Sequence, residues 1–303
     1  PVGVDDVPAS PSDTLPEPPA RDTAAPSADC DIPRVPALRW LHPDDALRFP
    51  EGAEVSLDGG DFFPTTSLTL AADTTLRARY IGCESAFEHT YRVLTAGPTD
   101  DGVSPALPLT WATSISSYTP GEDVAPAWQD TSRALGPAAA SSTHVVSLGH
   151  GGAITLTFDA LLYDGPGPDL ALWENAFSTT FLELAFVEVS SDGTTFARFD
   201  AVSRGTAPVD AFGAVDPASL DGLAGRHPLG LGTPFDLALL RHHPEVIAGD
   251  VDLLRLRYVR ILDIPGDGRA LDAFDRPIYD PHPTTVSAGF DLDGVGLLHA
   301  ARP

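Results

Sequence analysis

The sequence of 303 residues contains no lysine and no methionine, and it has only one asparagine and one glutamine. Its basic and acidic residues number 18 and 43, so the formal net charge is −25 at pH 7. Binding to phosphates requires basic side chains that displace counterions, so this charge argues against a nucleic-acid partner. It argues equally against an anionic membrane surface. No apolar run approaches the roughly 18–20 residues of a membrane-spanning helix, and we expect no direct membrane span.

Cysteine is scarce too, with only Cys30 and Cys83. Their number is too small for a disulfide scaffold, and no Cys or His spacing typical of zinc surrounds them. We expect one disulfide bond in an oxidising compartment, with two buried free thiols as the alternative. Signatures of catalysis are also missing, because the sequence has no G-x-S-x-G motif, no P-loop and no G-x-G-x-x-G opening a helix. We therefore expect an exported protein that is not an enzyme.

Residues 1–29 consist mainly of Pro, Ala, Ser, Thr and Asp and have almost no large apolar side chains. Such a segment cannot bury enough surface to offset its chain entropy. We predict a disordered, acidic stalk, similar to that of a lipoprotein, which holds the folded domains away from a cell envelope. An ordinary flexible terminus is the alternative.

Residues 30–96 alternate between apolar and polar side chains in AEVSLDGG, SLTLAADTTLRARYIG and AFEHTYRVL. This alternation predicts β-strands, and Asp58-Gly59-Gly60 predicts a hairpin turn. The segments VSLDGGDF, LTL and DTTLRARYIG resemble the small immunoglobulin-like domain at the C-terminus of chitobiases and hexosaminidases. The resemblance implies a sandwich that serves as a spacer or accessory module. A Cys30–Cys83 bond would connect its first segment to a late strand.

Residues 97–303 form the larger predicted domain, which follows the turn GPTDDG. Its short alternating runs are each bounded by Gly, Pro or Asp: THVVSLG, AITLTFDALLY, DLALWEN, ELAFVEVSSDG, TFARFDAVS, DLLRLRYVRILDI and GFDLDGVGLL. This pattern predicts an antiparallel sandwich or jelly roll, so the whole chain is expected to be all-β. The segments 204–250 and 264–288 are expected to be long loops, where binding sites usually lie.

A turn stiffened by prolines, DGPGPD, carries Asp164 and Asp169, and Glu174 and Asn175 end the next strand. Carboxylate and amide oxygens on turns and strand ends are the ligands that calcium prefers. Asn175 is the only asparagine of a strongly biased composition, which favours a specific role for its amide. A turn residue that caps its own backbone is the alternative.

The closing strand GFDLDG carries Asp291 and Asp293. Because the first and last strands of a jelly roll usually lie close together, we expect one of these residues to meet the turn and strand end described above. The predicted calcium site thus comprises Asp164, Asp169, Glu174, Asn175, Asp291 and Asp293.

Weaker candidates for ligand binding lie elsewhere in the larger domain. Trp128, Tyr163 and Tyr279 offer aromatic faces for stacking, while Trp173 lies in an alternating strand and is expected in the core. Asp267 belongs to an acidic loop that would repel itself unless it is solvated or bridged by a cation. His282 lies between two prolines. No H-x-H or H-E-x-x-H pattern favours a copper or zinc site, and a transition metal remains a minor alternative.

The segments VSLGHGGAITLTFDALLYDGPGPDLALWENAF, ELAFVEVSSDGTTFARF, FDLALL, RYVRILD and GFDLDGVGLL resemble a family of bacterial cell-surface protein domains. The hairpin VEVSSDGTTFARF is also similar to galactose-binding-like and discoidin-like jelly rolls. The resemblance implies a jelly roll, export and a role at the cell surface, and calcium is common in such folds. It also implies ligand capture, because some relatives lie beside outer-membrane uptake systems, including those for corrinoids. The loop before Phe235 departs from the pattern, with Thr-Pro in place of Gly-Asp.

Together these observations predict an exported surface protein without catalytic activity. It would bind a carbohydrate or surface polymer through the loops of a calcium-stabilised jelly roll. Two alternatives stay open: capture of a small molecule or metal complex, such as a corrinoid, for an outer-membrane receptor, and a structural or adhesive spacer.

Overall fold

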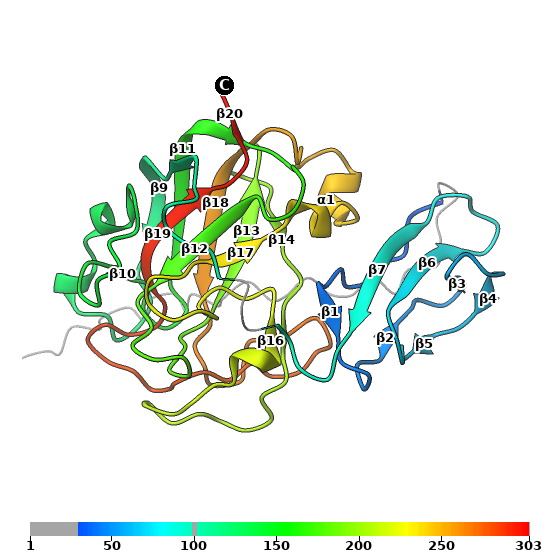
Figure 1. The fold of residues 1–303 in the computed structure, drawn as a ribbon, viewed down its shortest axis with the longest axis horizontal. Coiled ribbons are helices and arrows are strands. Elements are labelled where there is room, and N and C mark those ends of the chain that lie inside the picture. The colour runs from blue at the N-terminus through cyan, green and yellow to red at the C-terminus, as the bar shows by residue number, and fades with distance from the viewer. Residues whose placement is uncertain (1–29, 99–101, 303) are drawn as a thin grey trace, which may run out of the picture.

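A computed structural model describes residues 30–98 and 102–302, in which two β-modules lie side by side (Figure 1). The predicted stalk, residues 1–29, lies outside the described residues. Strands predominate in both modules, as the sequence pattern predicts, and the only α-helix of the described residues is α1 (Pro244–Ile247). No helix among the described residues is long and apolar enough to cross a membrane.

The first module is a small β-structure in which five strands form one sheet in the order β1-β7-β6-β3-β4, and β2 pairs with β5. Its strands are β1 (Trp40–Leu41), β2 (Leu47–Arg48), β3 (Ala53–Leu57), β4 (Phe63–Pro64), β5 (Ser67–Leu68), β6 (Thr74–Tyr80) and β7 (Phe87–Val93).

The strands of this module follow the predicted alternation. In β6, Leu76, Ala78 and Tyr80 are buried, whereas the arginines between them are half-exposed. The predicted turn lies between β3 and β4, and both Asp58 (φ 49°) and Gly59 (φ 76°) adopt the positive φ of a type I′ hairpin turn. The predicted disulfide bond between Cys30 and Cys83 is confirmed.

The second module contains two facing sheets. One has the order β10-β19-β12-β17, with β8 on β19, and the other has the order β14-β13-β18-β11-β20, with β9 on β11. The strands are β8 (Thr110–Trp111), β9 (Ser114–Thr119), β10 (Val146–Ser147), β11 (Ala153–Leu162), β12 (Leu170–Glu174), β13 (Ala185–Ser190), β14 (Ala197–Arg198), β15 (Val202–Ser203), β16 (Leu220–Asp221), β17 (Thr233–Phe235), β18 (Leu256–Asp263), β19 (Asp291–Leu297) and β20 (Ala300–Ala301). The short 3₁₀ helices are η1 (Pro126–Trp128), η2 (Thr131–Ala134), η3 (Pro217–Ser219) and η4 (Leu237–Leu240).

The main core lies between these two sheets, so the second module is a β-sandwich. All of β12 is buried, because it is covered on both faces. Leu170 and Leu172 contribute to the core between the sheets, and Ala171 and Trp173 pack on the other face. Trp173 is fully buried against Trp111, which confirms its expected place in the core.

Long connections gather at one end of the sandwich, the lower end in Figure 1. The segment 264–290 between β18 and β19 contains no strand or helix, as expected for a long loop. The segment 204–250 is more structured than expected, since it contains β16, β17, η3, η4 and α1. Strand β12 runs from the opposite end of the sandwich to this end.

Candidate functional site

The DGPGPD turn brings Asp164 and Asp169 together with Asp236, and one carboxylate oxygen from each lies within 4.8 Å of the others. Asp169 is buried and accepts hydrogen bonds from the backbone N–H of Gly165 and of Leu237, both at 2.7 Å. Burial raises the pKa of Asp169 and of Asp236. These oxygens could hold a cation, but basic groups already lie beside them.

Two basic side chains lie against this turn. The Arg241 guanidinium donates to Asp164 Oδ2 at 2.8 Å, and the His299 imidazole lies 2.7 Å from Asp169 Oδ1. Asp164 Oδ1 is buried and has no hydrogen-bond partner among the described residues. The turn is thus a partly compensated acidic group rather than a site that requires an added charge.

A second polar group lies where β12 ends against β19. The Asn175 amide donates to Asp291 Oδ2 at 3.0 Å and to the backbone carbonyl of Ser142 at 3.1 Å. Glu174 Oε2 accepts from the backbone N–H of Ala176 at 2.9 Å. Two oxygens here, Glu174 Oε1 and Asn175 Oδ1, are buried without a hydrogen-bond partner in the described structure. Such orphaned acceptors are costly, so each requires an explanation.

Five carboxylates are buried around this point and interact electrostatically with one another, each at most 6% exposed: Glu174, Glu183, Asp263, Asp280 and Asp291. Glu183 accepts a hydrogen bond from the Thr284 hydroxyl at 3.0 Å. In the part of the chain that the structure describes, none of the five forms an ion pair with an arginine. We call this set, together with Asn175, the buried acidic cluster.

The electrostatics of the buried acidic cluster disfavour full ionisation. Burial, followed by the charge of Asp291, raises the pKa of Glu174 well above its ordinary range. Burial and the same neighbour raise the pKa of Glu183, and burial with the charge of Asp263 raises that of Asp280. Burial also raises the pKa values of Asp263 and Asp291 to about 7. Five such groups need either protons or a cation to remain buried at neutral pH.

The six residues of the predicted calcium site therefore do not lie in one place. Asp164 and Asp169 lie before the start of β12, whereas Glu174 and Asn175 lie at its end, a separation of roughly 17 Å at the usual rise per strand residue. Asp291 joins Glu174 and Asn175, as the closing-strand argument predicts. Asp293 is used elsewhere, because its oxygens accept from the backbone N–H groups of Ala139 at 2.9 Å and Ala140 at 2.8 Å.

The weaker candidates are dispersed over the second module. Trp128 lies in η1, and Tyr163 is half-buried with its ring 5.7 Å from that of His299. The half-buried Tyr279 and Asp267 lie in the loop 264–290, where Arg269 forms an ion pair with Asp267. His282, in the same loop, packs against His150 with ring centroids 4.8 Å apart. No common stacking surface is formed by the three predicted aromatic residues.

Exposed phenylalanine side chains occur instead on the segment that follows β12 and on the connection between β15 and η3. Phe177, two residues after Asn175, is 64% exposed, and Phe212 is 91% exposed. The Phe181 ring lies between them, 5.9 Å from that of Phe177 and 6.3 Å from that of Phe212, at an angle of 24° to the latter. We call these three rings the phenylalanine platform. Exposed apolar side chains that lie next to one another are typical of interaction surfaces.

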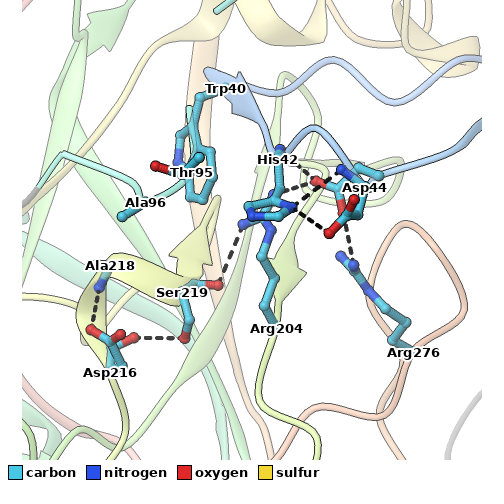
Figure 2. A pocket seen from close by; sticks show the side chains of 11 residues that line it. Trp40, His42, Asp44, Thr95, Ala96, Arg204, Asp216, Ala218, Ser219 and Arg276 are labelled. Carbon is cyan, nitrogen blue, oxygen red and sulfur yellow. Dashed lines mark hydrogen bonds and ion pairs between the residues drawn. The ribbon is translucent and has the colours of Figure 1, made fainter. Parts of the chain in front are cut away.

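A pocket of about 350 Å³ lies between the two modules (Figure 2). Its arginines, Arg204 and Arg276, both pair with the buried Asp45, and Arg204 stacks at 3.8 Å on the ring of Trp40. Because Arg204 covers this ring and Trp40 is only 1% exposed, no stacking face is left for a ligand. The pocket belongs to the contact between the modules.

Similarity to known proteins does not identify the site. No protein-family model matches the chain, and no curated protein matches it. The family resemblances based on short motifs accordingly remain predictions.

Several of these residues could not be assigned from the sequence. Glu183 and Asp236 have no motif around them, although a glutamate within the apolar run FLELAFV is a signal of a buried carboxylate. Phe181 and Phe212 lie in segments without periodicity, and only the three-dimensional structure brings their rings together.

Proposed function

We propose that the protein is a non-catalytic, exported binding protein whose β-sandwich is stabilised by calcium in the buried acidic cluster. The observation that carries this proposal is the pair of orphaned acceptors, Glu174 Oε1 and Asn175 Oδ1, beside carboxylates without an arginine partner. Calcium takes six to eight oxygen ligands, and side chains of this cluster offer oxygens from both sheets and from loops. Asn175, Glu174 and Asp291 would hold the ion, and Glu183, which interacts electrostatically with Asp291 and Glu174, is a further donor.

A structural role for the ion is favoured over a catalytic one. The side chains of the buried acidic cluster are shielded from solvent, so a substrate has no access to them. An ion at this place would connect β12 to β19 and to the loops that carry the phenylalanine platform.

We propose a neutral carbohydrate or surface polymer as the ligand, bound on the phenylalanine platform. Aromatic rings stack on the apolar faces of sugars, and Ser178, Thr179 and Asp210, which are close to these phenylalanines in the sequence, are exposed polar residues. The net charge of −25 disfavours a polyanion. Export is compatible with the disulfide bond.

Thermal unfolding with calcium or with EGTA tests the ion. Binding to the folded state alone contributes about 2.7 kcal/mol at a hundredfold excess over Kd, which corresponds to roughly 5–10 °C in Tm for a module of this size. Asp291→Asn should abolish the rise. Asp293→Asn is the matched control, because it changes the same strand two residues away and should preserve the rise. An unchanged Tm in the wild-type protein would disprove the calcium proposal.

Binding to a panel of insoluble polysaccharides tests the ligand. Phe212→Ala should weaken binding several-fold without lowering Tm, because this side chain is almost fully exposed. Phe63→Ala is the control, since Phe63 is an exposed phenylalanine of the first module. If no polysaccharide binds, the carbohydrate proposal fails and the spacer hypothesis gains support.

A further inference from the structure

Two histidines from distant parts of the sequence meet beside the buried acidic cluster. His150 lies in the connection between β10 and β11, and His282 lies in the loop between β18 and β19. Their ring centroids are 4.8 Å apart, with an angle of 67° between the ring planes. Both side chains are half-buried.

Each ring presents one buried nitrogen that has no hydrogen-bond partner among the described residues. These atoms are His150 Nδ1 and His282 Nδ1. An imidazole nitrogen buried without a partner is unfavourable, and two of them on adjacent rings form a pair that packing alone does not explain.

The tautomer of His150 is fixed by its other nitrogen. His150 Nε2 lies 2.9 Å from the backbone carbonyl oxygen of Thr284, which can only accept a hydrogen bond. Nε2 therefore carries a proton, and in the neutral imidazole Nδ1 has a free lone pair. This is the arrangement of metal-binding histidines, in which a carbonyl or carboxylate orients the ring through the nitrogen that does not bind the metal.

The spacing of the rings also fits a shared metal. Two imidazoles bound to one tetrahedral ion at about 2.0–2.1 Å hold their ring centres roughly 5 Å apart. The observed 4.8 Å agrees with this value.

The local charge favours a cation as well. Asp263 interacts electrostatically with His150, and Asp267 interacts with His282. Arg269 is the nearby basic group, and it forms an ion pair with Asp267. Hard ions such as calcium prefer oxygen, whereas imidazole nitrogen selects divalent transition metals.

We propose that His150 and His282 form a second metal site, which binds a divalent transition-metal ion such as zinc through their Nδ1 atoms. Two protein ligands leave the remaining coordination positions open to water or to a donor group of an external molecule. The site is separate from the calcium proposal, because it uses nitrogen ligands rather than carboxylate and amide oxygens.

Isothermal titration of the full chain with zinc chloride, with and without saturating calcium, tests this proposal. We expect one equivalent of zinc to bind in both conditions. His150→Ala and His282→Ala should each weaken binding at least tenfold. His144→Ala is the control, because this exposed histidine should leave the affinity unchanged.

X-ray absorption of the wild-type protein loaded with zinc keeps the test valid even if a variant fails to fold. Two nitrogen ligands of imidazole type support the proposal, and coordination by oxygen alone overturns it. It is also overturned if zinc does not bind, if calcium displaces it, or if neither histidine variant changes the affinity. A failure of calcium to bind would leave the zinc result intact, so the two proposals can fail separately.

Discussion

The contact between the modules and the lower end of the sandwich both bury carboxylates, but they compensate the charge in opposite ways. At the contact, Asp45 is 3% exposed and pairs with Arg204 and Arg276. Asp200 and Asp221 of the second module pair with Arg34 and Arg39 of the first. In the buried acidic cluster, none of the described carboxylates has such a partner.

The pKa values show the consequence. At the contact, burial alone would raise the pKa of Asp45, but hydrogen bonds from Arg204 and from the His42 backbone lower it below its ordinary value. In the cluster, burial and neighbouring carboxylates act together and raise the pKa of Glu174. The protein supplies its own counter-charge where the modules meet and lacks it at the end of the sandwich. The second region therefore needs either protons or an external cation to stay buried at neutral pH.

The largest expected effect is at the contact between the modules. Asp45→Asn leaves Arg204, which is 14% exposed, and Arg276 without their shared partner. Breaking a buried pair in this way typically costs about 3–5 kcal/mol of unfolding free energy. Urea denaturation should show the loss with or without calcium. Asp44→Asn is the control, because the Asp44 side chain is 91% exposed. An equal loss of unfolding free energy in both variants would contradict a special role of the buried Asp45 at the contact between the modules.

The next effect is a pH dependence of the calcium-free protein. The pKa of Asp291 is about 7 in the folded state against 3.8 ordinarily, so the folded state binds more protons between these values. Its contribution to stability is therefore present at low pH and is lost as pH rises through about 7. We expect about 2–3 kcal/mol less stability at pH 8 than at pH 5 from this group.

The measurement is the difference between wild-type protein and Asp291→Asn, both in EGTA. Burial lowers the pKa values of His89, His242 and His243, and these groups favour folding at higher pH, in the opposite direction. They are common to both proteins and cancel in the difference, which reports Asp291 together with its effect on the pKa values of Glu174 and Glu183. A difference that does not change with pH would show that this carboxylate is not destabilised by burial.

A smaller effect of unusual sign is expected for Glu174→Gln. Without calcium, burial raises the pKa of Glu174 and so penalises its charged form, and the neutral glutamine should raise the unfolding free energy at high pH. With calcium, it removes a ligand and should lower stability relative to wild type. A loss of stability in both conditions would mean that the cluster is already compensated.

The sequence pattern was informative where side chains alternate. The strands β11, β12, β13, β18 and β19 lie within the runs that predict them, because each run is rich in apolar side chains that are buried and is bounded by turns. The disulfide and the burial of Trp173 follow from the same kind of evidence. The pattern failed at β8, β9, β16, β17 and β20. All of these except the six-residue β9 are two or three residues long and depend on pairing with neighbours.

The candidate site was predictable only in part. Asn175, Glu174 and Asp291 are correctly associated because a strand end and the closing strand are neighbours in the sheet. The predicted ligands do not form a single site. Because β12 is extended, the residues at its two ends are too far apart to bind one ion. Glu183 and the pair of His150 with His282 depend on contacts across more than 90 residues, which no local pattern encodes.

The smallest expected effect is at the ion pair between Asp267 and Arg269. Its carboxylate is compensated, like those at the contact between the modules, but the pair is exposed to solvent. Burial tends to raise the pKa of Asp267, but hydrogen bonds from Arg269 outweigh it and lower that pKa. The Arg269 side chain is 61% exposed, so water screens the pair. Asp267→Asn should therefore change the unfolding free energy by less than about 1 kcal/mol. Raising the salt concentration should reduce the effect further, whereas the loss in Asp45→Asn should persist. A large loss of unfolding free energy in Asp267→Asn that does not depend on salt would contradict the argument that water screens this ion pair.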